Sequence, residues 1–504
     1  MVGVPGRSKG CITCRKRKKG CDLKQPACGQ CQERGITCGG YDADRIFVYL
    51  DEGARHQTNR ASSGSNTFRT KDVDQPLRNG SLQVRTTQAA VARRNARQPL
   101  PSGFTLPLSL CRSAYEEKSL EAFISLYLPQ INSSVTNWDG KEIVGIVPVL
   151  STRDEALRLA ISAIGTVALS KQMNDSSLAA HGRNLYGKAL AETRRALASP
   201  SRSRSTAVLA IPRVMALFEI LFGAEENTGN QANSWLKHAE GEKDLIVARG
   251  PAAYTDDDAH SMFASARWRP LIAAVRLRKR TVLNEEIWKI LPWRGRIKTP
   301  NDSLLDITAA IPEILENVDR WGNLSSGSPE DEARDLVTSA KCWTLHMKLE
   351  EWLATNEHEI LTPATINPTP ITFGNYEVAC LTTRYWVTSL LLYTALDTAS
   401  GVPPWDESCT HPDRPHPRHF ARLITRSVAY FFRPEFGATG ATSISFPLGN
   451  TMLFMQRNPV VDAPYMAIVK RAWNDPDLPS AIKKFLNSLR LSVSPRSSPG
   501  PGEV

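Results

Sequence analysis

The sequence has few of the features that place a protein outside the cell or in a membrane. Its first ten residues contain no apolar segment, so we expect no secretory signal peptide, and Val2 excludes N-myristoylation. The most apolar stretch, residues 206–223, is interrupted by Pro212, Arg213 and Glu219. Central charges make insertion into a bilayer unfavourable, so this stretch is predicted to be a buried core helix. A cytosolic or nuclear protein is expected, with its cysteines reduced.

Recognisable catalytic motifs are also lacking. The sequence contains no G-x-S-x-G, no phosphate-binding P-loop, no H-E-x-x-H and no dinucleotide-binding glycine pattern. Runs of alternating polar and apolar residues, typical of β-strands, are absent from residues 104–490, where apolar residues instead recur at helical spacing. We therefore expect a large all-α domain there and no enzymatic activity.

Histidine is absent from the first 55 residues, where cysteine is abundant. Six of the ten cysteines follow the spacing C-x2-C-x6-C-x6-C-x2-C-x6-C, which is one C-x2-C-x6-C pattern repeated: Cys11, Cys14, Cys21, Cys28, Cys31 and Cys38. A disulfide framework does not suit a chain without a secretion signal. One tetrahedral zinc ion would leave two cysteines unused, whereas two zinc ions could use all six if two sulfurs bridge both metals. About forty residues bury little core, so metal ions would stabilise the fold in its place.

The chain as a whole has no excess of negative charge, and its excess of positive charge lies in one region. Residues 1–100 hold 19 Lys and Arg against 8 Asp and Glu, whereas residues 101–504 hold 43 of each sign, so the whole net charge of +11 lies in the first fifth of the chain. Five basic residues follow Cys14 without a break. This asymmetry indicates a basic module for a polyanion, followed by a neutral globular body.

Residues 11–38 resemble the fungal binuclear zinc cluster DNA-binding domain in every cysteine spacing, in the basic run and in Pro26. The resemblance implies a small module of two short helix–strand halves around two zinc ions. Cys11 and Cys28 would bridge the metals, Cys14 and Cys21 would complete one site, and Cys31 and Cys38 the other. Pro26 would shape the loop between the halves.

The resemblance also gives roles to the basic run. In the family, a lysine at the position of Lys18 contacts the bases of a CGG triplet, and guanine O6 and N7 are suitable acceptors for an ammonium group. Arg15, Lys16, Arg17 and Lys19 are then expected to contact the DNA backbone or to signal nuclear import. The predicted function is that of a nuclear, sequence-specific regulator of RNA polymerase II genes.

A coiled coil after the cysteines is lacking as well. Residues 46–100 contain no sustained apolar heptad, so no zipper dimer is predicted. We expect four segments: the zinc cluster domain at 1–45, a basic flexible linker at 46–103, an α-helical regulatory domain at 104–490 and a disordered tail at 491–504.

Three phrases of the helical body resemble the regulatory domain of the same fungal family, at 235–251, 267–293 and 427–448. The resemblance implies a domain that dimerises or binds a small effector. Expected partners are double-stranded DNA, the transcription machinery, a second copy of the chain and a small-molecule effector, with no membrane. The alternative is a helical ligand-binding or enzymatic protein that carries a zinc module for localisation or protein contact.

Two polar segments of the helical body are candidates for a functional role. Residues 313–335 are rich in acids, which suggests an acidic activation patch, although a solvated loop between helices is favoured. Residues 411–420 contain three histidines, His411, His416 and His419, and suggest a metal site, although an exposed loop is favoured there because of the three prolines.

Overall fold

The computed structural model describes most of the helical body and the core of the cysteine-rich segment. The described residues are 11–38 except 12, 15, 16, 18, 25 and 26, and then 108–127, 145–223, 230–322, 329–363, 367–409, 411–476, 478 and 480–491. The chain divides into two compact units, residues 1–105 and 106–504. The predicted linker at 46–103 and the tail after residue 491 lie outside the described residues, as do Arg15, Lys16, Lys18 and Pro26.

The described part of unit 1 contains one short helix, α2 (Gly29–Gln32), and a helical turn at Thr13–Cys14. The segments that follow these turns, residues 19–24 and 36–38, form no paired strand. The rest of this unit's core consists of cysteine side chains, of which Cys11, Cys14, Cys28 and Cys31 are buried.

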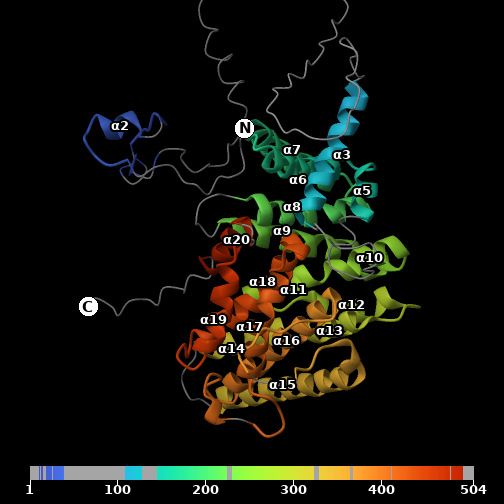
Figure 1. Cartoon of the computed structure of the whole chain (residues 1–504), viewed down its shortest axis with the longest axis vertical. Helices are drawn as coiled ribbons and strands as arrows, with labels where there is room; N and C mark the ends of the chain where they lie inside the picture. The colour runs from blue at the N-terminus through green and yellow to red at the C-terminus, as the bar shows by residue number, and fades with distance from the viewer. Residues whose placement is uncertain are drawn as a thin grey trace, which may run out of the picture. The chain divides into compact units, whose positions relative to one another are not determined.

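All regular secondary structure among the described residues of unit 2 is helical, which confirms the prediction of an all-α body (Figure 1). Its helices are α3 (Leu108–Tyr127), α5 (Ile146–Ser151), α6 (Glu155–Met173), α7 (Ser176–Ala198), α8 (Thr206–Phe222), α9 (Asn230–Arg249), α10 (Asp257–Ala266), α11 (Trp268–Leu277), α12 (Glu286–Ile290), α13 (Pro300–Thr308), α14 (Ile311–Gly322), α15 (Pro329–Asn356), α16 (Tyr376–Ala399), α17 (Pro417–Phe431), α18 (Gly437–Met455), α19 (Ala463–Trp473) and α20 (Ser480–Leu491). Short 3-10 turns lie between some of them, at Pro251–Tyr254, Val282–Asn284, Leu291–Trp293, Glu357–Glu359, Glu407–Cys409 and Pro434–Phe436.

Many of these helices begin where a short polar side chain can accept hydrogen bonds from the first turn. Asp154 caps α6, Asp175 caps α7 and Ser205 caps α8. At α13, Thr299 and Asp302 form a reciprocal capping box, with Pro300 in the first helical position. These caps stabilise the first turn of each helix and so determine the residue at which it begins.

The first layer of unit 2 is built by α3, α6 and α7. Helix α6 packs against both neighbours, and small residues allow the close approach. A Cβ added to Gly165 of α6 would lie 2.7 Å from the carbonyl oxygen of Ser119 in α3. A Cβ added to Gly182 of α7 would lie 3.1 Å from the backbone nitrogen of Val167 in α6. These glycines are therefore needed for the packing of the helices and not for a turn.

The central layer is built by α16, α17 and α18, with α15 covering α16 at one end of the unit (Figure 1). Helix α16 is buried over most of its length, including the hydroxyl side chains Thr382, Thr383, Thr388 and Ser389. Their burial is tolerated where the hydroxyl finds a partner. Thr383 donates to the carbonyl of Ala379, for example, and Thr388 shares a hydrogen bond with Thr308 of α13.

Buried arginines form ion pairs between different elements of unit 2. Arg213 of α8 lies against Glu242 of α9. Arg267, between α10 and α11, forms ion pairs with Asp302 and Asp306 of α13. Near the C-terminal helices, Arg414 pairs with Asp397, and Arg418 pairs with Asp462. Burial of a lone charge is costly, so each guanidinium in these pairs lies against a carboxylate from a different part of the chain.

The structure decides between the alternatives for the three polar or apolar segments. Residues 206–222 form the buried helix α8, as predicted. The solvated loop favoured for 313–335 is wrong at both ends, because residues 313–322 belong to α14 and residues 329–335 to α15. In α14, Glu313, Glu316 and Asp319 pair with Lys341, Arg280 and Arg278. Residues 323–328 lie outside the described part. No described helix has the length and hydropathy needed to cross a bilayer.

The exposed loop favoured for 411–420 is only partly correct. Residues 411–416 do precede a helix, but His416 accepts a hydrogen bond from the backbone of Arg418 and so caps α17. Arg414 and Arg418 turn inward and are buried. The polar composition of this segment therefore serves helix capping and buried ion pairs.

Candidate metal centre and DNA interface

The first half of the cysteine-rich module is a single helical turn that begins at Cys11. The backbone N–H of Cys14 points at the Cys11 sulfur, with a nitrogen–sulfur distance of 3.3 Å. Arg17 N–H donates to the Thr13 carbonyl, and Lys19 N–H donates to the Cys14 carbonyl at 3.1 Å. The C-x2-C spacing thus places two sulfurs on the same side of one turn.

The second half repeats this construction. Ile36 N–H donates to the Cys31 carbonyl at 3.1 Å, which is the same hydrogen bond, between the same repeat positions, as Lys19 to Cys14. Gly35 has a φ of +62°, the left-handed conformation that ends a helix in this way. The duplicated cysteine pattern therefore corresponds to a duplicated fold.

Two side chains that the sequence analysis did not single out support this arrangement. Both carboxylate oxygens of Asp22 accept from Gly29 N–H, at 2.9 and 3.0 Å, and Thr13 donates to the Thr37 carbonyl at 3.1 Å. The N-cap position of α2 is occupied by Cys28, whose side chain makes no capping hydrogen bond, so the acceptor comes from the first half of the module. No local pattern marks Asp22, because a capping side chain normally lies next to the helix that it caps.

The sulfur atoms form two overlapping groups of four. One group is Cys11, Cys14, Cys21 and Cys28, and the other is Cys11, Cys28, Cys31 and Cys38, with all sulfurs of a group within 4.8 Å of one another. Cys11 and Cys28 are common to both groups. Their sulfurs are 3.6 Å apart, and those of Cys14 and Cys28 are 3.7 Å apart. A tetrahedral zinc site with zinc–sulfur bonds of about 2.3 Å requires sulfurs about 3.8 Å apart, so the arrangement fits such an ion.

The protein alone does not favour thiolates at these positions. Burial, together with the neighbouring cysteines, raises the pKa of Cys14, Cys28 and Cys31 to about 12. At neutral pH a cation is therefore needed to remove these protons, and bound zinc does so because thiolate is its ligand. The six cysteines have the chemistry and the distances of a zinc-binding cluster.

Two residues of the basic run, Arg17 and Lys19, are described, and both are exposed. The other three, Arg15, Lys16 and Lys18, lie outside the described residues, so the assignment of base and backbone contacts remains a prediction. Three further cysteines lie apart from the cluster, in unit 2. Burial raises the pKa of Cys342 in α15 and Cys380 in α16 to about 12, as it does in the cluster, whereas Cys409 is exposed.

Comparison with protein families confirms the resemblance in both units. Residues 9–45 match the fungal Zn(2)-Cys(6) binuclear cluster domain, and residues 122–268 match the fungal specific transcription factor domain. The second match spans α5 to α10, the end of α3 and the first residue of α11. It includes the phrase at 235–251 and only the first two residues of the phrase at 267–293, and the phrase at 427–448 lies outside it.

Curated relatives match over short stretches. The chain is 52% identical over 40 residues to the arginine metabolism regulation protein II of Saccharomyces cerevisiae, which covers 7% of this chain and 4% of that protein. It is 54% identical over 39 residues to the aspercryptin biosynthesis cluster-specific transcription regulator atnN of Emericella nidulans (8% and 6%). The ustiloxin B cluster transcription factor ustR of Aspergillus flavus is 27% identical over 166 residues (31% and 26%).

The matched stretches thus span between 4% and 26% of the length of these three relatives. No solved structure matches the chain. The chain carries a fungal zinc cluster domain followed by a helical fungal transcription factor domain.

Proposed function

We propose that this chain is a nuclear, sequence-specific DNA-binding regulator of RNA polymerase II transcription. The cysteine cluster would hold two zinc ions, with Cys11 and Cys28 as bridging ligands. The observation that carries the proposal is the overlap of the two sulfur groups in these two residues. Six sulfurs arranged in this way supply four ligands to each of two ions, and the matches to zinc cluster transcription regulators supply the functional context.

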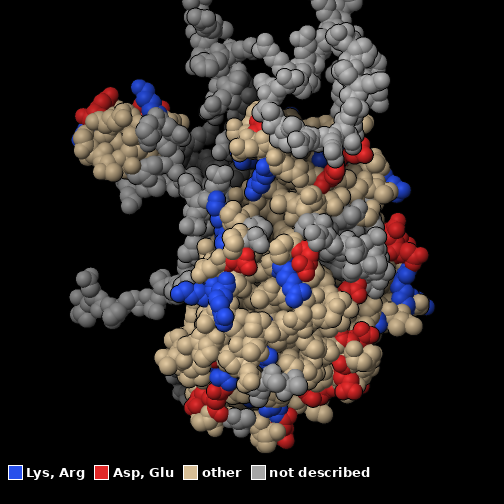
Figure 2. Space-filling model, viewed as in Figure 1, with Lys and Arg blue, Asp and Glu red and all other residues tan. Residues whose placement is uncertain are grey.

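In this proposal Lys18 contacts a CGG triplet in the major groove. Its neighbours Arg15, Lys16, Arg17 and Lys19 neutralise phosphates and position the domain. The charge distribution supports this assignment, since the excess positive charge of the chain lies within residues 1–100. On the visible face of unit 2, basic and acidic side chains are interspersed, as expected for a body with no net charge (Figure 2). The helical unit would control activity, by dimerising or by binding an effector.

The proposal is tested by measuring zinc content and DNA affinity of the full chain. Cys28→Ser removes a ligand common to both sulfur groups, so we expect zinc content to fall and binding to a CGG-containing duplex to be lost. Cys409→Ser is the matched control, because Cys409 is exposed and lies outside the cluster. Normal CGG binding by Cys28→Ser would exclude the binuclear cluster as the DNA-binding element.

The same assay on two duplexes separates the roles of the basic residues. Lys18→Ala should weaken binding to the CGG duplex by roughly 1–3 kcal/mol and change binding to a duplex with a scrambled triplet much less. Lys19→Ala serves as the comparison and should weaken both equally while reducing the salt dependence. An equal loss on both duplexes for Lys18→Ala would place Lys18 among the phosphate contacts.

A further inference from the structure

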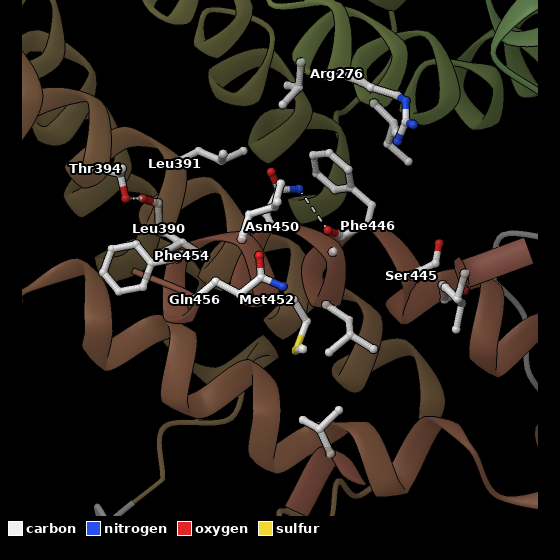
Figure 3. Close-up of a pocket in the computed structure, with 18 of the residues that line it drawn as sticks. Arg276, Leu390, Leu391, Thr394, Ser445, Phe446, Asn450, Met452, Phe454 and Gln456 are labelled. Atoms are coloured by element: carbon white, nitrogen blue, oxygen red, sulfur yellow. Dashed lines mark hydrogen bonds between the residues drawn. The ribbon is translucent and has the colours of Figure 1, made fainter. Parts of the chain in front are cut away.

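Unit 2 contains a large groove that the packing of its helices leaves open. Its volume is about 1970 Å³, and its walls come from helices far apart in the sequence, including α8, α11, α14, α16, α18, α19 and α20. Ligand sites commonly have volumes of roughly 300–1,000 Å³, so the groove is large enough for a sizeable organic molecule. Figure 3 shows its central part, where side chains of α16 and α18 face Arg276 of α11.

Helix α18 forms the floor of this groove and is unusual in composition. None of its 19 residues carries a charge. It packs on α17 and α16. Among its residues that line the groove, Phe446 is half-buried and Gly449 and Leu453 are exposed, and these three follow one another along the helix. Leu453 is 49% exposed. An apolar helix at the centre of a domain normally has both faces covered, so the open face is suited to an apolar ligand.

Gly449 of α18 has no side chain and therefore leaves space in the groove next to this helix. It lies inside a helix, where glycine is unfavourable relative to alanine, and a Cβ added there would meet no atom within 4 Å. The packing of the protein therefore does not require a glycine at this position. The absence of a side chain at Gly449 instead enlarges the part of the groove that borders α18.

The charged residues that line the groove are mainly basic. Asp319 is the single acidic side chain among the described lining residues, and it is held by Arg278. Two of the lining arginines, Arg213 and Arg269, lie against Glu242. The lining also includes Arg276, Arg457 and Lys470, of which Arg276 makes a contact within the protein and Arg457 lies over the Trp405 ring. The groove therefore combines an apolar floor with a net positive charge, which complements an anion.

Arg276 is the cation that lies deepest among these three. Burial lowers the pKa of its guanidinium, whereas Arg457 and Lys470 are exposed at the surface. Asn450 of α18 and Gln456, the residue that follows α18, offer amide groups to the groove (Figure 3). Asn450 donates to the Phe446 carbonyl at 2.9 Å, which leaves its amide oxygen available to the groove.

We infer that this groove binds an amphipathic organic anion, with its apolar body on the open face of α18 and its carboxylate or other acidic group at Arg276. Such a ligand would be the effector that the proposed function gives as one of its two modes of control, so the inference rests on that function for its biological meaning. Binding itself is independent of DNA and is measured separately.

The test uses two fluorescent probes with the same apolar body. 8-Anilinonaphthalene-1-sulfonate carries one negative charge, and N-phenyl-1-naphthylamine is its neutral counterpart. Both should bind the folded full chain saturably. Arg276→Met keeps the length and packing of the side chain but removes its charge, and should weaken binding of the sulfonate about tenfold while leaving the neutral probe unchanged. Arg280→Met is the matched control, because Arg280 is exposed, pairs with Glu316 and does not line the groove.

A second variant tests the location. Gly449→Leu places a side chain in the open space above α18 and should abolish binding of both probes while the near-UV circular dichroism stays that of the folded protein. Absence of saturable binding in the unaltered chain, or full binding by Gly449→Leu, would overturn the inference. An equal loss of both probes in Arg276→Met would overturn the role of the charge. CGG binding by the same preparations reports on the proposed function alone, so the two can fail independently.

Discussion

At the scale of single residues, the buried carboxylates of the helical unit are the side chains on which the largest energies depend. Glu242 is 1% exposed and accepts two hydrogen bonds of 2.8 Å from Arg269 while also lying 3.6 Å from Nε of Arg213. In the sequence it lies within "HAEGEKD", a polar phrase that suggests a solvated helix surface. Its importance follows only from the packing of α9 against α8 and α11.

Glu242→Ala should lower the free energy of unfolding by about 3–5 kcal/mol, because it leaves the buried Arg213 without its compensating charge. Glu121→Ala is the matched control and should change it by about 0–1 kcal/mol, since the Lys118–Glu121 pair is exposed. Urea denaturation followed by circular dichroism measures both. Equal effects of the two substitutions would contradict the assigned role of Glu242.

At the scale of elements, small residues decide how closely the helices approach. Glycine in a helix was not assigned a role from the sequence, because glycines that face a neighbour and glycines that face solvent follow the same pattern. The structure distinguishes them. Gly165 of α6 is buried against the backbone of α3, whereas Gly187 of α7 is exposed and a Cβ there would meet no atom within 4 Å.

Alanine at these two positions should therefore act in opposite directions. Gly165→Ala should destabilise unit 2 by about 1–3 kcal/mol, because its methyl group would collide with the Ser119 backbone and force α3 away from α6. Gly187→Ala should stabilise the protein by about 0.5–1 kcal/mol, since alanine favours the helix and meets no obstacle. The shift of the urea midpoint at constant slope gives both values. Stabilisation by Gly165→Ala would show that α3 does not pack as described.

At the scale of the whole molecule, two different physical forces stabilise the two units. Unit 2 has a continuous apolar core built from its helices, including Leu157, Ile211 and Tyr393. The described core of unit 1 consists of the cysteines alone. A fold of this kind depends on metal binding, because the free energy of zinc coordination replaces that of a hydrophobic core.

Chelation of zinc should therefore affect the units unequally. A strong chelator should abolish DNA binding, because unit 1 loses its fold, while the thermal unfolding transition of unit 2 stays unchanged. The far-UV circular dichroism should also change little, since the described helical residues of unit 1 are confined to one turn and α2. Both signals are followed on one preparation, and restored zinc should restore DNA binding. A lower transition temperature after chelation would mean that the helical unit also depends on metal.

The sequence by itself determined the features that rest on local spacing. The repeated cysteine pattern predicted a zinc-binding cluster, and the apolar periodicity predicted an all-α body, because both depend on residues close together in the chain. The cysteines of the cluster have also been brought together in the structure, with Cys11 and Cys28 in both sulfur groups.

Tertiary structure alone decided what depends on residues distant in the chain. It assigned Asp22 to the N-terminus of α2, turned Arg414 and Arg418 inward, and made the acids of 313–322 part of an ion-paired helix. It also left one face of α18 open opposite Arg276. The physical reason is that burial and pairing of a charge depend on which helices pack together, and the pattern along one helix does not specify its neighbours.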